Sequence, residues 1–254
     1  MIFQGKNFKI SVNTPTISAL EAEVKQRFQA GKGFALATMN VDHLVKLANS
    51  KEFAEAYSKQ DLIVADGNPI VWLAKLSGKP VDLIAGSDQT IPLIRWATEC
   101  GVPVAFVGST EDVLREATEE LERLVPNAKI VARISPPFGF DPSGGLAREI
   151  LEDVNNSGAK LCIVALGAPK QEIFAALGRE YAPTVGFASF GAGIDFIAGH
   201  QKRAPRWVRR IAMEWLWRML SNPKRLAKRY AECAVVLPGH TMSALAQRQK
   251  PDGS

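Results

Sequence analysis

The chain has 254 residues, of which 46% are apolar and 22% charged, proportions typical of a globular protein with a buried core. Its three cysteines, Cys100, Cys162 and Cys233, form no CxxC pair, which argues against a disulfide framework and for a reducing compartment. The first residues contain no apolar leader, and no run of about 18 apolar residues occurs, so we expect neither a signal peptide nor a membrane span. These features predict a cytoplasmic protein.

Six short apolar runs predict buried β-strands. They cover residues 34–38, 62–65, 102–107, 129–132, 161–166 and 184–190. Each run is apolar on both faces, as is typical of strands that lie between two layers of helices. Amphipathic stretches such as residues 111–124 and 146–155 separate the runs and predict helices. This alternation predicts an α/β fold, a Rossmann-like parallel sheet of about six strands with helices on both faces.

The segment from residue 201 onward differs in its apolar pattern. A wide stripe at helical spacing favours packing in a core over contact with a membrane, and it comprises Trp207, Val208, Ile211, Ala212, Trp215, Leu216, Met219 and Leu220. Pro223 interrupts that helix, and a second basic helix is expected over about residues 224–236. Residues 247–254 lack apolar side chains and are expected to be disordered. We therefore predict an α/β core, residues 1–200, and a helical appendage, residues 201–254.

The positive charge of the chain is concentrated in this appendage. The formal net charge is +5, but residues 201–230 hold ten Lys and Arg against one acid, Glu214, so that segment is +9 and the remainder −4. A basic segment of this kind attracts phosphate, nucleic acid or anionic lipid.

Small and polar residues lie at the carboxyl ends of five of the six predicted strands. In an open parallel sheet, ligands bind at the carboxyl ends of the strands, where glycines let a ligand approach the backbone and helix N-termini favour an anion. The candidate ligand-binding residues at these ends are Thr38, Asn40, Asp66, Gly67, Gly108, Lys170, Gln171 and Asp195. They predict a binding site along one edge of the sheet.

Several of these residues also have a structural interpretation. Asn40 can cap the helix that follows it, Asp66 and Gly67 form a common turn dipeptide, and Asp195 can serve as a helix cap or a hydrogen-bond acceptor. Asp66 is the strongest candidate for catalysis, because a carboxylate at this edge can take a proton from a sugar hydroxyl.

Motifs of other protein classes are missing from the sequence. No GxGxxG follows a strand, and no GxxxxGK[ST] occurs, which disfavours a nicotinamide dehydrogenase and a P-loop kinase. The Asp-x-Asp pair of metal-dependent sugar transferases is also missing, so arginines would have to neutralise a leaving diphosphate. The three histidines, His43, His200 and His240, show no metal spacing, and we expect them on the surface or in loops.

Together these segments resemble the WecG/TagA/CpsF family of glycosyltransferases, from about Ala37 to Tyr230. The blocks that carry the resemblance, in chain order, are Thr38-Met39-Asn40, Asp66-Gly67, Gly86-Ser87-Asp88, Gly167 to Glu172, Gly193 to Gly199 with Lys202 to Pro205, Glu214 to Arg218, and Asn222 to Arg225. One such block would be weak evidence, but several in this order are specific.

The resemblance implies an inverting transfer, with no metal or other cofactor, in the synthesis of cell-surface polysaccharides or exopolysaccharides. A nucleotide-sugar, expected to be UDP-linked, would donate the sugar to a polyprenyl-diphosphate-linked sugar. Asp66 would be the general base, and Thr38, Asn40 and Gln171 would position the sugars.

The resemblance also implies that the appendage closes over the active site and meets an anionic membrane surface, which predicts peripheral attachment to the inner face of the cell membrane. Arg218, Arg225 and Lys228 would hold the diphosphate. The same face could instead bind another subunit, so a homo-oligomer is possible. Two residues depart from the family pattern, since Lys228 and Leu83 each stand where the family usually has arginine. The loss of a cation at Leu83 leaves the identity of the donor sugar and of the acceptor open.

Two other functions are alternatives at this stage. The basic C-terminal helices with their tryptophans suit a nucleic-acid-binding protein, although the resemblance implies no nucleic-acid partner. A dinucleotide oxidoreductase is opposed by the missing glycine fingerprint.

Overall fold

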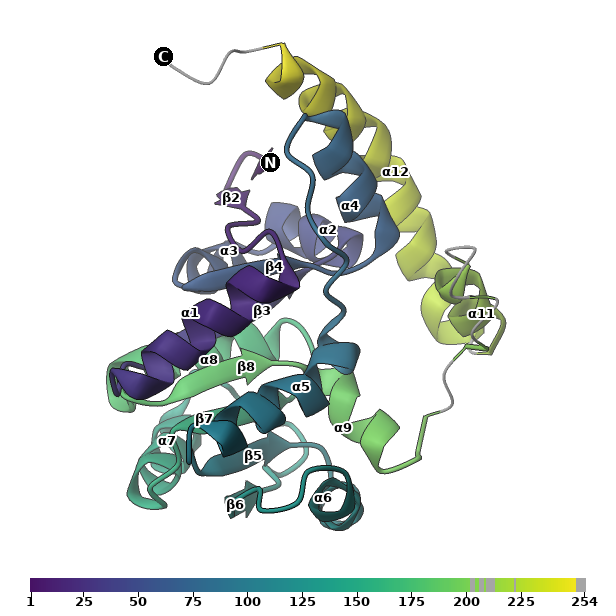
Figure 1. Ribbon diagram of the computed structural model, residues 1–254. Helices are drawn as coiled ribbons and strands as arrows, with labels where there is room; N and C mark the ends of the chain where they lie inside the picture. Colours follow the sequence, from purple (N-terminus) through teal and green to yellow (C-terminus); the bar gives the residue numbers. More distant parts are fainter. Residues whose placement is uncertain (202–203, 206–207, 209–212, 222, 250–254) are drawn as a thin grey trace.

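A six-stranded parallel sheet forms the centre of the protein, in the order β4-β3-β8-β7-β5-β6 (Figure 1). The computed structural model describes residues 1–201, 204–205, 208, 213–221 and 223–249. The strands are β3 (Phe34–Met39), β4 (Leu62–Ala65), β5 (Val104–Gly108), β6 (Ile130–Ile134), β7 (Leu161–Ala165) and β8 (Gly186–Ser189). The predicted α/β fold is confirmed, and every predicted strand end lies within two residues of an observed one.

Helices cover both faces of the sheet. One layer comprises α1 (Ile17–Gln29), α5 (Gly86–Glu99), α6 (Glu111–Leu124) and α9 (Gly191–Ile197), and the other α2 (Val41–Asn49), α3 (Lys51–Ser58), α7 (Gly145–Asn156) and α8 (Lys170–Tyr181). Successive residues of β3 face opposite layers, since Phe34 and Leu36 pack in one core cluster while Ala35 and Ala37 pack in the clusters of the other face. Five of the strands are therefore buried on both sides, as their apolar sequences predict, whereas the edge strand β6 is only partly buried, with Val131 41% exposed.

The C-terminal helices lie against the β4 side of this core. They are α11 (Glu214–Ser221) and α12 (Pro223–Arg248), and α12 runs beside α4 (Asn68–Leu76) and packs on α2 (Figure 1). Cys233 and Ala244 of α12 are buried in the same apolar cluster as Leu44 of α2. The prediction of a separate appendage beginning at residue 201 stays a prediction, but its long helix shares a core with the sheet domain.

Helix α12 extends well beyond the expected end near Val236. The side chain of Gln247 accepts a hydrogen bond from the Ile2 N–H (2.9 Å) and donates one to the Ile2 carbonyl (2.7 Å). Ile2 belongs to a two-stranded hairpin of β1 (Ile2–Gln4) and β2 (Lys9–Ser11). This tertiary contact keeps Gln247 and Arg248 helical, although they belong to the segment expected to be disordered, of which residues 250–254 lie outside the described part.

The aromatic stripe expected to pack in a core is partly exposed. Trp215 is 43% and Trp217 37% exposed, and Leu220 is 69% exposed. The Trp215 ring meets the Tyr230 ring edge-on at 5.7 Å, which joins α11 to α12. Trp207 of the same stripe lies outside the described residues. No helix in the described part of the chain is long and apolar enough to cross a bilayer.

The direction in which the chain connects neighbouring strands reverses twice across the sheet. The chain moves from β3 outward to β4 and then crosses back to β5, and it moves from β5 outward to β6 before returning to β7. In open α/β sheets, ligands bind in crevices at the carboxyl edge where such reversals occur, which predicts one crevice beside β3 and a second between β5 and β7.

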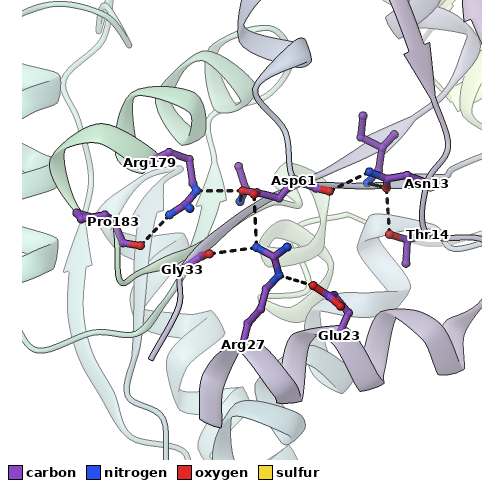
Figure 2. A network of polar contacts seen from close by, with 10 residues as sticks. Asn13, Thr14, Glu23, Arg27, Gly33, Asp61, Arg179 and Pro183 are labelled. Atoms are coloured by element: carbon purple, nitrogen blue, oxygen red, sulfur yellow. Dashed lines mark hydrogen bonds and ion pairs between the residues drawn. The ribbon is translucent and has the colours of Figure 1, made fainter. Parts of the chain in front are cut away.

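The opposite, amino edge of the sheet is held by a network of charged side chains centred on Asp61, which precedes β4 (Figure 2). Its Oδ2 accepts hydrogen bonds from the Ala35 N–H (2.8 Å) and from Arg179 Nε (3.0 Å), and Arg27 lies 3.4 Å from Oδ1. Arg27 and Arg179 also donate to the carbonyls of Gly33 and Pro183, which precede β3 and β8. One carboxylate thus ties together the starts of three neighbouring strands.

Candidate functional site

Asp66 lies at the junction of β4 and α4, beside the end of β3. The two strands pair in parallel with Thr38 opposite Val64, and the Asp66 N–H continues the pairing by donating to the Met39 carbonyl (2.8 Å). Gly67 follows with φ +93°, a left-handed conformation that turns the chain into α4 at no steric cost. The half-buried Asp66 carboxylate is therefore held at the sheet edge beside a helix N-terminus, where negative charge is favoured.

Thr38 is buried, and its carbonyl is held from two sides. The Tyr57 hydroxyl and His43 Nδ1 both donate to the Thr38 carbonyl, each at 2.6 Å. Burial, with the nearby Lys46 ammonium, lowers the pKa of His43 to about 4, so the ring is neutral. Burial, together with the carboxyls of Glu172 and Asp66, raises the pKa of Tyr57, so it remains a phenol. Two neutral donors thus position the end of β3.

The expectation that all three histidines lie on the surface or in loops is wrong for His43, which is 4% exposed. A buried position could have been read from the sequence, because His43 shares the inner face of α2 with Leu44 and Leu47. His200 is exposed and pairs with Glu116 at 2.6 Å. His240 lies on α12 and meets the Phe3 ring edge-on.

Asn40 takes the structural role considered for it. Its Oδ1 accepts the His43 backbone N–H (3.0 Å) and caps α2. The start of α5 packs against the same strand end, since a Cβ at Gly86 would lie 3.1 Å from Thr38 Cγ2. Leu83, which stands where the family usually has arginine, lies three residues before Gly86 and is 44% exposed. The Thr38, Asp66 and Gly86 blocks of the sequence therefore converge at the β3 and β4 ends.

Gln171 connects the start of α8 to the end of β8. Its Oε1 accepts the Gly191 N–H (3.2 Å), and its Nε2 donates to the Ser189 carbonyl (3.2 Å) and to Glu172 Oε1 (2.8 Å). The side chain is buried, so both of its amide N–H groups are used within the protein. Lys170 Nζ instead donates to the Phe140 carbonyl in the loop after β6 (2.6 Å).

Glu172 is a member of this site that the sequence did not single out for a role. It is fully buried, and burial raises its pKa to about 7 despite the hydrogen bond from Gln171. Its Oε2 has no hydrogen-bond partner among the described residues. A buried carboxyl with a raised pKa beside candidate ligand-binding residues is typical of a functional site.

The second crevice contains Gly108 and Asp195. Gly108 has φ +115°, and a Cβ there would lie 2.4 Å from the Ala165 carbonyl carbon, so only glycine fits between β5 and β7. Asp195 Oδ1 lies 3.4 Å from Ser109 Oγ, and its Oδ2 accepts from Gln201 Nε2 (2.8 Å). The predicted residues therefore divide between two crevices, and Asp195 belongs to the β5 side rather than to the Asp66 side.

Comparison with known proteins identifies the family of the chain. The family model described as "Glycosyl transferase WecG/TagA/CpsF family" matches residues 6–252. The chain belongs to this family. It is 31% identical over 195 residues, 76% of this chain and 74% of the relative, to the N-acetylglucosaminyldiphosphoundecaprenol N-acetyl-beta-D-mannosaminyltransferase of Bacillus spizizenii. The protein is thus a glycosyltransferase, which confirms the resemblance found in the sequence and sets aside the nucleic-acid and oxidoreductase interpretations.

The basic residues expected in this transferase are only partly described. The side chains of Arg218 and Arg225 lie outside the described residues, and Lys228 is exposed on α12 with its Nζ 3.9 Å from Glu232. Arg229, which the sequence analysis did not single out, lies 3.9 Å from Asp42 in the first turn of α2. It places a cation of α12 next to the helix that Asn40 caps.

Proposed function

We propose that this glycosyltransferase moves a sugar from a nucleoside-diphosphate donor to a hydroxyl of a polyprenyl-diphosphate-linked sugar, with inversion and without a metal ion. The observation that carries the proposal is the position of Asp66, fixed by backbone pairing to the end of β3 and directed to the edge where ligands bind in such sheets. The name of the Bacillus spizizenii relative supports N-acetylmannosamine as the sugar and an N-acetylglucosaminyl diphosphoundecaprenol as the acceptor.

In the proposed reaction Asp66 acts as the general base. The acceptor hydroxyl oxygen attacks the anomeric carbon from the face opposite the diphosphate, and the Asp66 carboxylate takes the hydroxyl proton. The bond between the anomeric carbon and the diphosphate oxygen breaks, and the diphosphate leaves with the electron pair. A single displacement of this kind inverts the anomeric centre.

The two crevices suit the two ends of such a donor. Three strand spacings of ~4.8 Å separate β3 from β5, a span of roughly 14 Å that fits an extended nucleotide-sugar better than a single sugar ring. We place the sugar beside Thr38 and Asp66 and the nucleotide toward Gly108 and Asp195. Uridine diphosphate is the proposed carrier, and Gln171 and Lys170 lie between the two ends.

The proposed role of Asp66 is tested by Asp66→Asn, an isosteric change that removes the base. Loss of general base catalysis should lower kcat by a factor of roughly 10² to 10⁴, with the melting temperature and nucleotide binding unchanged. Turnover is measured by mass detection of product from UDP-N-acetylmannosamine and an N-acetylglucosaminyl diphospholipid. Near-normal turnover by Asp66→Asn would contradict the proposed role of Asp66 as general base. Inactivation of the wild type by a chelator would contradict the proposal that the reaction needs no metal ion.

We further propose that the basic C-terminal segment holds the enzyme at the anionic inner face of the cell membrane, where a lipid-linked acceptor lies. Lys224 and Lys228 are both exposed on the first turns of α12, and each lysine near an anionic surface contributes about 1 kcal/mol. The full-length double variant Lys224→Glu with Lys228→Glu should therefore bind anionic vesicles at least about tenfold more weakly. The matched control, Lys129→Glu with Lys160→Glu at the amino edge of the sheet, should bind normally; equal loss in both variants would contradict the assignment.

A further inference from the structure

A buried polar layer lies beneath the ends of β3 and β8. It comprises Gln171 and Glu172, in the first turn of α8, and Ser189, the last residue of β8, and each of them is at most 5% exposed. Strand β8 pairs in parallel with β3, with Ala188 opposite Leu36, so Ser189 lies beside the last residues of β3. The buried layer therefore borders the strand end where the proposed sugar site lies.

Three hydrogen bonds fix the Gln171 amide within this layer. Its Nε2 donates to the Ser189 carbonyl (3.2 Å) and to Glu172 Oε1 (2.8 Å), and its Oε1 accepts the Gly191 N–H (3.2 Å). Two of these contacts alone would leave the amide free to rotate about the line that joins them, whereas a third fixes its plane. The shortest of the three is the contact with Glu172, so this carboxyl completes the positioning of the amide.

The same hydrogen bonds determine what the Gln171 amide can offer a ligand. A glutamine side chain has two N–H donors and an oxygen with two lone pairs. Both donors and one lone pair are used here, so the second lone pair of Oε1 is what remains. This group can accept a hydrogen bond from a hydroxyl or an amide N–H, but it cannot donate one to a phosphate oxygen. Gln171 is therefore suited to a sugar rather than to a diphosphate.

Stability does not account for a carboxyl at position 172. The backbone of Glu172 is already held, since Gln60 Nε2 donates to its carbonyl (3.1 Å) and joins α8 to the segment before β4. In the described part of the chain the carboxyl has one side-chain partner, Gln171, and its Oε2 has no partner there. Burial raises the pKa of Glu172 to about 7 despite this hydrogen bond, so the site penalises the charged form.

We propose that Glu172 is a positioning residue of the transferase. Its carboxyl accepts one N–H of Gln171 and fixes the amide so that Gln171 Oε1 accepts a hydrogen bond from a hydroxyl or an acetamido N–H of the bound sugar. Glu172 does not touch the substrate and acts through Gln171. This inference rests on the proposed function, because that function places the sugar at the β3 side of the sheet edge.

Two substitutions at position 172 separate the acceptor oxygen from the rest of the side chain. Glu172→Met removes the acceptor at similar volume and should lower kcat by roughly tenfold, as expected for the loss of one hydrogen bond. Glu172→Gln keeps an oxygen for Gln171 Nε2 and should hold kcat within about threefold of the wild type. Glu180→Met, at an exposed carboxylate of the same helix, is the matched control and should leave kcat unchanged. The dissociation constant of UDP, measured by calorimetry, should be the same in all four proteins.

A double-mutant cycle tests whether Glu172 acts through Gln171. Gln171→Met removes the amide, so adding Glu172→Met to it should lower kcat no further. Independent, additive losses would overturn the proposal. It would also be overturned if Glu172→Gln lost as much activity as Glu172→Met, because the acceptor oxygen would then not be what matters.

The amide can also be observed directly by NMR of the ¹⁵N-labelled full-length protein. The Gln171 side-chain N–H signals, assigned by their absence from Gln171→Met, should exchange slowly with solvent in the wild type and in Glu180→Met. In Glu172→Met they should exchange at least about tenfold faster, because one N–H has lost its partner. Unchanged exchange would overturn the proposal. A wild type that does not turn over the sugar donor would instead contradict the proposed function, and the exchange rates would still decide whether Glu172 fixes the amide.

Discussion

At the amino edge of the sheet, Asp61 pairs with two arginines and a backbone N–H, whereas at the carboxyl edge Glu172 is fully buried and only one of its oxygens has a partner among the described residues. The first arrangement stabilises the fold, because each charge is matched and partly solvated. The second costs free energy, because burial penalises the charged carboxyl. The network that stabilises the strands and the proposed active site thus lie at opposite edges of the sheet.

The carboxyl edge also differs in the protonation states of its groups. Burial keeps His43 neutral and Tyr57 a phenol, and it raises the pKa of Glu172 to about 7. Groups whose pKa values depart from their ordinary values in this way cluster at functional sites. The comparison leads to three tests, from the largest expected effect to the smallest.

Glu172→Gln should change the pH dependence of stability. The pKa of Glu172 is about 7 in the folded protein against an ordinary 4.5, so the folded state binds more protons between these values, and the contribution of Glu172 to stability should fall by about 3 kcal/mol as pH rises through them. Glutamine does not titrate, so this fall should vanish. Urea unfolding of the wild type and of Glu172→Gln at about pH 5 and about pH 8 measures how the free energy of unfolding of each protein depends on pH.

His43 contributes with the opposite sign. Its pKa is lowered from 6.5 to about 4, so its contribution to stability is present above 6.5 and is lost as pH falls toward 4. The term is common to wild type and Glu172→Gln and cancels in their difference. Glu152→Gln on the exposed side of α7 is the control. Parallel pH curves for wild type and Glu172→Gln would show that the buried carboxyl does not titrate.

Asp61→Asn should lower stability and leave catalysis intact. The change removes the charge that binds Arg27 and Arg179, and hydrogen bonds to charged groups contribute about 1.5–3 kcal/mol, so we expect a loss of about 2 kcal/mol in the free energy of unfolding. The kcat of the folded fraction should not change. Asp66→Asn is the matched substitution at the other edge and should do the reverse, so similar profiles for the two variants would break the comparison.

Tyr57→Phe should have the smallest effect. It removes one of two donors to the Thr38 carbonyl and leaves His43 Nδ1 in place, so a loss of about 1 kcal/mol in stability is expected. Any fall in kcat should stay below roughly tenfold, with KM unchanged, because the carbonyl keeps a partner. A larger fall in kcat than that caused by Asp66→Asn would show that Tyr57 itself acts in the reaction.

Local patterns predicted the sheet and its edge well. The six strands were readable because short apolar runs mark them, and Asp66, Thr38 and Gly108 were found because they lie at the strand ends or directly after them. The family blocks located the same edge without distinguishing its two crevices. That division depends on the strand order, which connects segments far apart in the sequence.

The rest depends on tertiary contacts. Nothing near Glu172 in the sequence predicts its burial. The Gln171 amide donates both to Glu172 and to the carbonyl of Ser189, and Ser189 belongs to β8, a segment distant in the sequence. The length of α12 was underestimated because Cys233, Ala244 and Gln247 form no strong apolar period, yet each contacts the sheet domain or the N-terminal hairpin.

The pair of hydrogen bonds between Gln247 and Ile2 has a consequence for the order of assembly. The two residues are 245 positions apart, so this contact cannot form until all the residues between them have been made. At synthesis rates of about 5–20 residues per second, Ile2 leaves the ribosome roughly 10–50 seconds before its partner. Over that interval the backbone N–H and carbonyl of Ile2 lack this partner, which only α12 can supply.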